Sequence, residues 1–488
     1  MASGKHCTDQ KYKSDSAMNE WYGEWLQRRG DVSSSLTDTL EQAIRSGRLL
    51  AGAQLPTHRD LAKRLGVAVS TVTKAYAEAT RRGLIDATVG RGTFVLANAA
   101  DDPATTRDNL RPLDRLYLPL MQREDAINLS LNEPLTAGTD ERLRDAIAAL
   151  TARHDLNDLA HYQPAQGQIT YRKAGAAWLK ELGVEASAED VYAVSGGQTA
   201  LMTIFLGLAR PGETVLTEEL TWPGALSAAR LTGIRLKPVA IDADGMIPAA
   251  FDEACAATRP RFVYTMPTLH NPTTATASLS RRREIAAIAR ARNVLIVEDD
   301  AYGFLIEPRV TPYFELARDI TVYLTSLSKS IAPALRVGFM AVPPRLHKAM
   351  RAAMRATTTM VSPILLELTT HMINSGAGRE AGKAQRTASA KRQKLAAKIL
   401  GPEGSSPTSM HYWLRLPSDM RNAVFVADAL SNGVAVTPGD AFVVTPGQDP
   451  GGVRICLCAE PDQRRVETAL RTLARLVQAD HGAALAIV

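Results

Sequence analysis

The chain has 488 residues, of which 45% are apolar and 22% are charged, a composition that is ordinary for soluble globular proteins. This length allows about three domain-sized units, each with its own core. No apolar run approaches the roughly 18 residues of a membrane helix, and the first 15 residues are polar and lack the apolar centre of a signal peptide. The four cysteines have no metal or redox spacing, so we expect a cytoplasmic protein without disulfides, with Cys456 and Cys458 buried along a strand.

The positive charge of the chain is concentrated in one segment. Between Arg45 and Arg91 there are nine lysines and arginines against three acidic residues, and this excess of six equals the formal charge of +6 of the whole chain. Charge gathered in this way favours a polyanionic partner, although a chance cluster of surface charges would give the same count.

The same segment predicts two short helices separated by a tight turn. Residues 35–45 form an amphipathic pattern that precedes them. Thr57 is a suitable cap for a helix from Arg59 to Leu65, which Gly66 ends, and Ser70 is a suitable cap for a second helix that runs to Arg82. This is the helix-turn-helix arrangement, in which the second helix lies in the major groove of DNA. A helical protein-interaction module is the alternative.

Residues 84–95 alternate around a Gly-Arg-Gly tip and predict a hairpin wing that carries Arg91. From about Leu36 to Val95 the chain resembles the GntR-type winged helix-turn-helix, through the segments Gly47-Arg48-Leu49, Leu55-Pro56, Arg59-Asp60-Leu61-Ala62, Leu65-Gly66-Val67, Ser70-Thr71-Val72 and Gly90-Arg91-Gly92-Thr93-Phe94-Val95. In this resemblance Val69 stands where these proteins often carry a base-reading arginine. The resemblance implies that six residues face a double-stranded DNA operator: Arg59, Ser70, Thr71, Thr73, Lys74 and Arg91.

The pattern along the chain divides it into four parts. Residues 1–18 are expected to be a flexible arm, residues 19–97 the DNA-binding domain, and residues 98–126, which lack periodicity, a linker. From residue 127 onward, strand-like runs alternate with helical patterns, which predicts an α/β domain with a mostly parallel sheet and ligands at the carboxyl ends of its strands. The predicted strands are Asp190–Val194, Thr214–Thr217, Arg235–Val239, Phe262–Thr265, Val294–Glu298 and Ile320–Leu324.

A lysine follows the last of these strands, in the stretch from Thr325 to Ser330. Lys329, beside small hydroxyl residues, suits a Schiff base to pyridoxal phosphate, because the amine must be fixed over the cofactor and have a low pKa. Ser326, Ser328 and Arg336 could bind the phosphate, the arginine as a planar fork. The alternative is a solvated lysine in a serine-rich turn.

Other residues that suit this cofactor precede Lys329 in order. The turn at Gly197 and Gln198 joins a strand to a helix, where backbone N–H groups can hold a phosphate. Asn271 lies in an Asn-Pro turn and can donate to the phenolate oxygen, although a simple turn is commoner. Asp299 ends a strand and can pair with the pyridinium nitrogen, while Tyr302 follows it. Solvation or a metal site is the alternative for the carboxylate, and no cluster of ligands supports a metal.

Together these residues resemble the site of fold-type I aminotransferases, from about Ile127 to the C-terminus. The resemblance implies that Asp299 meets the ring nitrogen, and that Asn271 and Tyr302 meet the phenolate oxygen. Thr274 and Ala334 stand where the family usually has glycine. Three further roles follow from the resemblance: Trp222 stacks on the ring, Tyr162 reaches the phosphate of the partner subunit, and Arg454 binds the carboxylate of a substrate or effector.

A winged helix joined through a linker to an aminotransferase-like domain is similar to the architecture of MocR/GabR-type regulators. The expected fold is therefore a mainly α N-terminal domain and an α/β fold-type I transferase with a large and a smaller α+β domain. The favoured hypothesis is a transcription factor, a head-to-tail homodimer, that senses an amino acid or amine through external aldimine formation. The alternatives are a working aminotransferase with a DNA-binding appendage and a DNA binder with an inactive, dimerising domain. The sequence does not identify the effector.

Overall fold

The chain divides into two compact units, residues 1–114 and 115–488. The predicted arm at residues 1–18, the linker up to residue 125, and Arg91 lie outside the described residues. Within the described residues, no helix is long and apolar enough to cross a membrane. The computed structural model describes residues 32–45, 49, 53–81, 84–88, 92–95, 126–135, 138–445 and 447–478.

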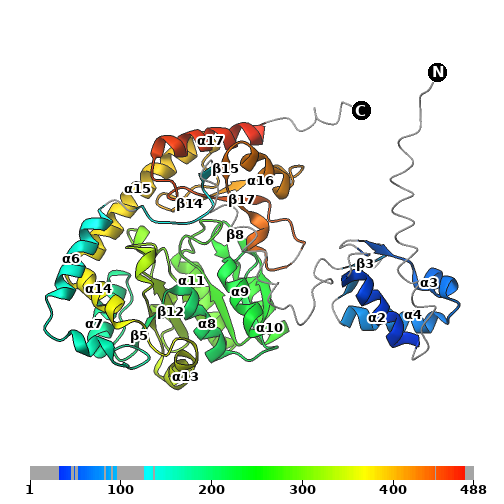
Figure 1. Cartoon of the computed structure of the whole chain (residues 1–488), viewed down its shortest axis with the longest axis horizontal. Coiled ribbons are helices and arrows are strands. Elements are labelled where there is room, and N and C mark those ends of the chain that lie inside the picture. The colour runs from blue at the N-terminus through cyan, green and yellow to red at the C-terminus, as the bar shows by residue number, and fades with distance from the viewer. Residues whose placement is uncertain are drawn as a thin grey trace. The chain divides into compact units, whose positions relative to one another are not determined.

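The described part of the first unit contains three helices that pack around one apolar core, together with a small sheet (Figure 1). Leu40, Leu61, Val72 and Ala75 are buried in this core, because each helix turns one apolar face inward. The elements are α2 (Val32–Arg45), β1 (Gln54–Leu55), α3 (His58–Leu65), α4 (Val69–Arg81), β2 (Ile85–Thr88) and β3 (Gly92–Val95).

The ends of α3 confirm the sequence prediction, whereas the start of α4 corrects it. The Thr57 side chain accepts a hydrogen bond from the backbone N–H of Asp60, and Gly66 ends α3 in the left-handed region at φ 67°. The α4 helix begins at Val69, and the Thr71 N–H donates to the Ala68 carbonyl oxygen at 3.0 Å. Ser70 therefore lies inside the first turn and is not the cap.

The predicted hairpin wing is confirmed. Strands β2 and β3 pair in antiparallel fashion, with Ile85 opposite Val95 and Thr88 opposite Gly92. The two-residue strand β1 also pairs with β3, which gives the sheet order β1-β3-β2. The sequence analysis missed β1, because two residues are too few to produce a period.

The second unit is built on a seven-stranded sheet of order β5-β13-β12-β11-β10-β6-β7. Strand β13 runs antiparallel to both of its neighbours, and the other pairings are parallel. All six predicted strands are present within two residues of their predicted ends, while β13 was not predicted. The strands are β5 (Val191–Val194), β6 (Thr214–Glu218), β7 (Arg235–Val239), β10 (Phe262–Thr265), β11 (Leu295–Asp299), β12 (Thr321–Ser326) and β13 (Gly338–Ala341).

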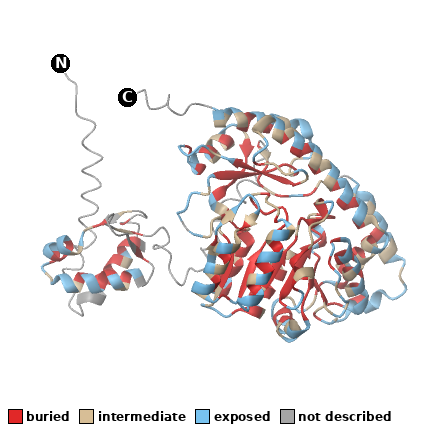
Figure 2. Ribbon diagram, turned by 180° about the vertical axis from the view of Figure 1, so that it is seen from behind, coloured by how far each residue is buried: buried red, intermediate tan, exposed pale blue. Residues whose placement is uncertain are grey.

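Helices cover both faces of this sheet. Alternate residues of β6, β10 and β11 contribute to two separate apolar cores, as Val263 and Tyr264 of β10 illustrate. Figure 2 shows the buried strands between helices whose outer faces are exposed. Helices α7 (Ile169–Glu181), α8 (Gly197–Leu208) and α9 (Pro223–Thr232) contribute to one core, and α10 (Pro248–Thr258), α11 (Leu279–Ala291) and α12 (Tyr313–Leu316) to the other.

A smaller layer lies beyond the carboxyl ends of the parallel strands and has its own apolar core (Figure 1). It contains the antiparallel sheet β14-β17-β16 and the parallel pair β15-β4, with helices packed against them. Cys456 and Cys458 are buried at and just beyond the end of β17, as predicted. The elements are β4 (Ile127–Asn128), β14 (His411–Arg415), α16 (Asn422–Ser431), β15 (Val434–Ala435), β16 (Thr437–Pro438), β17 (Gly452–Cys456) and α17 (Gln463–Gln478).

The remaining helices connect the two layers and flank the large sheet. The longest, α15, runs from the large layer to the core of the smaller one. These helices are α6 (Thr139–Thr151), α13 (His347–Thr357), α14 (Pro363–Asn374) and α15 (Ala377–Leu400). The two short strands β8 (Ile241–Asp242) and β9 (Gly245–Met246) form a separate pair.

Candidate functional site

A cavity of about 230 Å³ lies between the large sheet and the smaller layer, at the ends of β5, β6, β10, β11 and β12. Residues that are far apart in the sequence meet here, because the carboxyl ends of parallel strands lie at one edge of the sheet. We name this cavity the cofactor pocket. Eleven of the residues singled out in the sequence line it: Gly197, Gln198, Trp222, Asn271, Asp299, Tyr302, Ser326, Ser328, Lys329, Arg336 and Arg454.

Lys329 follows β12 and extends into the cofactor pocket. Its Nζ donates a hydrogen bond to the carbonyl oxygen of Asn132. Burial lowers the pKa of Lys329 to about 8, because the charged ammonium is poorly solvated there. A larger share of the amine is therefore neutral near pH 7 than for an exposed lysine, as a nucleophilic amine requires.

The hydroxyl groups and the arginine that were assigned to a phosphate lie together. Ser326 Oγ donates to Ser328 Oγ at 3.1 Å, and Arg336 Nη1 donates to Ser328 Oγ at 3.3 Å. Among the described residues no carboxylate lies within ion-pair distance of Arg336. Two hydroxyls and a guanidinium without an acidic partner suit an anionic group.

Gly196 allows the backbone before α8 to approach Arg336 closely. Its backbone angles are φ 82° and ψ 170°, in a region that only glycine readily adopts. A Cβ atom at this position would lie 2.6 Å from Arg336 Nη2. The free N–H groups of the first turn of α8, which begins at Gly197, thus lie beside the guanidinium. The sequence analysis named Gly197 and missed the role of Gly196.

Asp299 lies at the end of β11 and is 5% exposed. The hydroxyl of Tyr264 donates to its Oδ2 at 2.8 Å. Burial raises the pKa of Asp299 to about 7, although the hydrogen bond from Tyr264 lowers it, and the neighbouring Asp300 contributes to the increase. A positive charge bound beside it, such as a pyridinium nitrogen, would lower this pKa and leave an ion pair.

Arg454 reaches the cofactor pocket from β17 in the smaller layer. Its Nη1 donates to Asn271 Oδ1 at 2.9 Å, and its Nη2 donates to the carbonyl oxygen of Ser130 at 2.7 Å. The guanidinium carbon lies 4.9 Å from the centre of the Phe442 ring. Arg454 is 3% exposed, so its charge is held at the boundary between the two layers.

Trp222 precedes α9, and its position depends on Gly224. A Cβ atom at Gly224 would lie 2.3 Å from Gln198 Oε1 and 2.5 Å from the Trp222 ring. Gln198 Nε2 donates to the Gly224 carbonyl oxygen at 3.1 Å. The indole and the Gln198 amide therefore share the space that this glycine leaves open.

Two further polar residues at the site, Asn132 and His411, were not predicted from the sequence. Asn132 lines the cofactor pocket and its Nδ2 lies 2.9 Å from Tyr302 Oη and 3.0 Å from His411 Nδ1. His411 is fully buried on β14. Neither residue belongs to a motif, and a single histidine in an apolar strand usually indicates core packing, so only the spatial contacts identify them.

Tyr162 does not line the cofactor pocket of its own chain. It is 88% exposed and lies between α6 and α7. Its assignment to the phosphate of a partner subunit stays a prediction.

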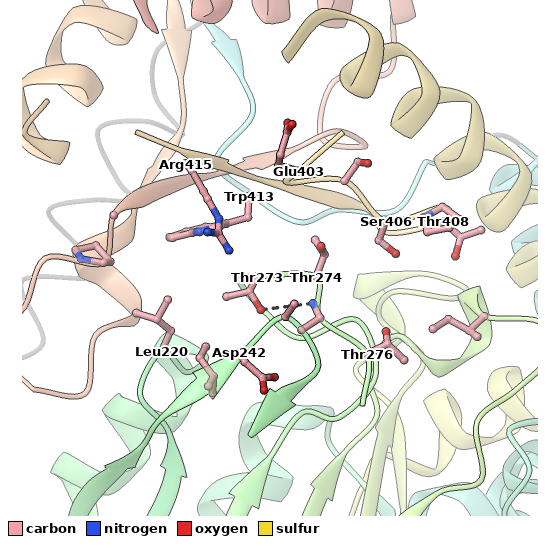
Figure 3. A pocket seen from close by; sticks show the side chains of 18 of the residues that line it. Leu220, Asp242, Thr273, Thr274, Thr276, Glu403, Ser406, Thr408, Trp413 and Arg415 are labelled. Atoms are coloured by element: carbon pink, nitrogen blue, oxygen red, sulfur yellow. Dashed lines mark hydrogen bonds between the residues drawn. The ribbon is translucent and has the colours of Figure 1, made fainter. Parts of the chain in front are cut away.

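A second, larger cavity of about 790 Å³ lies on the other side of the Asn271 turn, and none of the predicted cofactor residues lines it. Figure 3 shows Trp413 and Arg415 of β14 extending toward the turn that carries Thr273 and Thr274. Thr274 has φ 64°, a left-handed conformation that glycine adopts without strain. The departure from glycine at this position thus affects the second cavity and leaves the lining of the cofactor pocket unchanged.

In the first unit, the described residues assigned to DNA lie on α3 and α4. Arg59, Ser70, Thr73 and Lys74 are exposed, and Thr71 is half-buried. The opposite face of α4 is buried through Val72, Ala75, Tyr76 and Ala79. The exposed side of α4 is therefore available to a groove, and Val69 lies on it with 44% exposure.

The fold and the pocket together define the second unit as a fold-type I, pyridoxal-phosphate-dependent transferase fold. Residues 124–473 match the family described as aminotransferase class I and II, and residues 33–95 match bacterial regulatory proteins of the gntR family. The chain therefore belongs to the class I and II aminotransferase family and carries a GntR-type region, the combination found in MocR-type proteins.

Relatives of both kinds resemble this chain. The uncharacterized HTH-type transcriptional regulator YdeF of Bacillus subtilis is 29% identical, over 91% of this chain and 94% of its own length. The uncharacterized HTH-type transcriptional regulator YisV of the same species is 30% identical, over 65% of this chain and 69% of its own. The solved structure of LysN, α-aminoadipate aminotransferase from Thermus thermophilus, has a TM-score of 0.67 at 26% identity and covers 78% of this chain and 98% of LysN.

Pyridoxal phosphate is the cofactor of this family, and the residues of the pocket fit it. An amine with a lowered pKa, a buried carboxylate and an arginine that has no acidic partner among the described residues lie around one cavity, as the aldehyde, the ring nitrogen and the phosphate require. When bound, the cofactor supplies an electrophilic carbon and an electron sink. Among the described residues, no group of three His, Cys, Asp or Glu side chains could hold a metal ion.

Proposed function

We propose that this protein is a DNA-binding transcriptional regulator whose aminotransferase-like unit holds pyridoxal phosphate and senses an amino acid or amine. The observation that carries the proposal is a cofactor pocket with a complete set of polar groups in a chain that also has a GntR-type region with an exposed basic face. The domain boundaries that we propose are residues 19–97 for DNA binding, 98–126 for the linker and 127–488 for the effector unit.

An amino acid effector enters through its amine and is held through its carboxylate, whereas a simple amine uses only the first of these contacts. Its amino group competes with Lys329 for the cofactor, because both are nucleophilic amines directed at the same carbon. Arg454 binds the carboxylate as a planar fork. Because Arg454 belongs to the smaller layer and also contacts Asn271 of the large one, a ligand on Arg454 changes the contact between the layers.

The protein acts as a homodimer, in which Tyr162 of each subunit reaches the cofactor phosphate of the other. The support for this is the 88% exposure of an aromatic side chain that its own pocket does not use. Two DNA-binding units on linkers can hold two half-sites, and the effective concentration of the second unit then offsets part of the entropy cost of its contact. A ligand changes the DNA affinity of the dimer only if it binds one arrangement of the two DNA-binding units more tightly than another.

The experiment measures DNA binding with and without candidate amino acids. A double-stranded site is selected from a random pool by the purified full-length protein loaded with pyridoxal phosphate. The wild type is then compared with Lys329→Ala and, as a matched surface control, with Lys173→Ala on α7. We expect an amino acid to change the DNA affinity of the wild type and of the control, and to leave that of Lys329→Ala unchanged. Equal responses in all three would overturn the exchange at Lys329.

Turnover is the outcome that would favour the enzyme instead. Steady conversion of an amino acid with a 2-oxo acid, together with DNA affinity that no amino acid changes, would overturn the proposal that the second unit is a sensor. Enzymes of this fold use the same lysine and aspartate, so the DNA response and not the pocket decides between the two functions.

A further inference from the structure

A chain of hydrogen bonds joins the smaller layer to the cofactor pocket through residues that the proposed function does not use. Asn132 is 7% exposed, and its Nδ2 lies 2.9 Å from Tyr302 Oη and 3.0 Å from His411 Nδ1. On the other side of the imidazole, His411 Nε2 lies 3.1 Å from the carbonyl oxygen of His270. The chain thus runs from His270 through His411 and Asn132 to Tyr302.

The partners of His411 decide which ring nitrogen carries its proton. Burial, together with the nearby Arg454, lowers the pKa of His411 to about 3, so the ring is neutral and has one N–H group. The carbonyl oxygen of His270 can only accept, so the proton is on Nε2 and Nδ1 is an acceptor. Ser409 Oγ, 3.4 Å from Nδ1, is also able to donate to it, which agrees with this tautomer.

The tautomer of His411 in turn decides the orientation of the Asn132 amide. The group that faces an accepting Nδ1 must be the NH₂, and not the oxygen. The second hydrogen of the same NH₂ then points to Tyr302 Oη, which acts as the acceptor. Burial raises the pKa of Tyr302, so its phenol keeps a proton of its own.

We propose that His411 is a positioning residue that, through Asn132, directs the O–H of Tyr302 toward the cofactor. If the amide were reversed, Tyr302 would donate its proton to Asn132 Oδ1 and could not donate it to a group in the cofactor pocket. With the amide fixed by His411, the proton is free for the phenolate oxygen of the cofactor. This inference rests on the proposed function only in that the pocket holds pyridoxal phosphate. The Tyr302 and His411 rings are also in contact, with centroids 5.5 Å apart.

The test uses the full-length protein loaded with pyridoxal phosphate and measures the pH midpoint of its visible absorbance. A phenol that donates to the phenolate oxygen disfavours a proton on the nitrogen that Lys329 shares with the cofactor. Loss of that donation therefore raises the midpoint, by about one pH unit for one charge-assisted hydrogen bond. The other charged or titratable groups around Lys329 stay the same in every variant: Asp299, Arg336, Arg454, Glu133 and Cys456.

Three variants distinguish a role of His411 in directing the Tyr302 proton from a role in packing alone. His411→Phe keeps a ring against Tyr302 but removes both nitrogens, and we expect it to raise the midpoint by about one unit. His411→Asn places an amide oxygen near the position of Nδ1, so we expect it to restore a midpoint close to that of the wild type. Asn132→Ala removes the oxygen that would otherwise take the Tyr302 proton, so we expect it to keep a midpoint close to that of the wild type and, combined with His411→Phe, to abolish the shift.

A double variant completes the test. Tyr302→Phe removes the donor, so adding His411→Phe to it should cause no further shift. Additive shifts, no shift in His411→Phe, or a raised midpoint in Asn132→Ala would overturn the positioning role while leaving the regulator proposal intact. A DNA affinity that no amine changes, with midpoints that shift as expected, would instead overturn the regulator proposal alone. Wild-type protein that takes up no pyridoxal phosphate would overturn both.

Discussion

Gly196→Ala is the substitution that most directly tests how the cofactor pocket is assembled. The backbone angles of Gly196, φ 82° and ψ 170°, are nearly inaccessible to alanine, and forcing them costs about 1–3 kcal/mol. The new Cβ would also lie 2.6 Å from Arg336 Nη2 and 3.0 Å from its Cζ. Because the guanidinium is the flexible end of a long side chain, it would move away and leave Ser328 Oγ, from which it now lies 3.3 Å.

Two quantities should change in Gly196→Ala. The free energy of unfolding of the cofactor-free protein should fall by about 1–3 kcal/mol, from the backbone strain. The affinity for pyridoxal phosphate should fall as well, because the phosphate loses a charge-assisted hydrogen-bond partner worth about 1.5–3 kcal/mol. That loss corresponds to an increase in Kd of about 10- to 150-fold.

The assay combines urea unfolding without cofactor and titration with pyridoxal phosphate followed by absorbance. Gly376→Ala is the matched control, because Gly376 also has φ 82° and precedes α15, and a Cβ there meets nothing within 4 Å. We expect the control to lose about 1 kcal/mol of stability and to bind the cofactor like the wild type. If Gly196→Ala also binds the cofactor with wild-type affinity, the position of Arg336 does not depend on this glycine.

Three further outcomes follow from the two units. Lys329→Ala should abolish the covalent attachment of pyridoxal phosphate after borohydride reduction, and an adduct still seen by mass spectrometry would refute the assignment of Lys329. Neutralising Arg59, Lys74 or Arg91 should weaken DNA binding. The slope of log K against log salt concentration should fall by about 1 for each lost phosphate contact. An unchanged slope would refute the contact of the residue that was replaced. Burial raises the pKa of Asp299 from 3.8 to about 7, so the cofactor-free wild type should lose stability as the pH rises through this interval, because its folded state holds the proton more tightly. In urea unfolding at pH 5 and pH 8, Asp299→Asn should lack the part of the stability loss that comes from Asp299. An identical pH dependence of the free energy of unfolding in the wild type and in Asp299→Asn would refute this contribution.

Local sequence signals determined much of the secondary structure. The cap at Thr57 and the glycine at Gly66 set the ends of α3, because each acts on its own turn through a hydrogen bond or a backbone angle. The start of α4 at Val69 was missed by two residues, since Ser70 has the composition of a cap but lies within the first turn. Strand β13 was missed because Gly338–Ala341 begins with glycine and ends with alanine, two residues that are depleted in strands, and its pairing with β12 and β5 stabilises it.

The chemical identity of the pocket was also readable from the sequence, because the residues that carry it stand at the ends of predicted strands. Lys329, Asp299 and Asn271 each follow a buried strand, and parallel strands bring such positions to one edge. Their roles toward the cofactor stay predictions, supported by the distances and by the pKa values of about 8 for Lys329 and about 7 for Asp299.

Contacts between distant segments were decided only by the tertiary structure. The chain from His411 to Asn132 joins residues that are 279 positions apart, and the approach of Gly196 to Arg336 joins two loops on different strands. Secondary-structure propensity does not predict these pairs, because each residue on its own resembles an ordinary core or turn residue. The sequence by itself therefore determined which chemical groups are present and on which elements they lie. The packing of the smaller layer on the large sheet decided which of those groups touch, and hence which proton each of them can give.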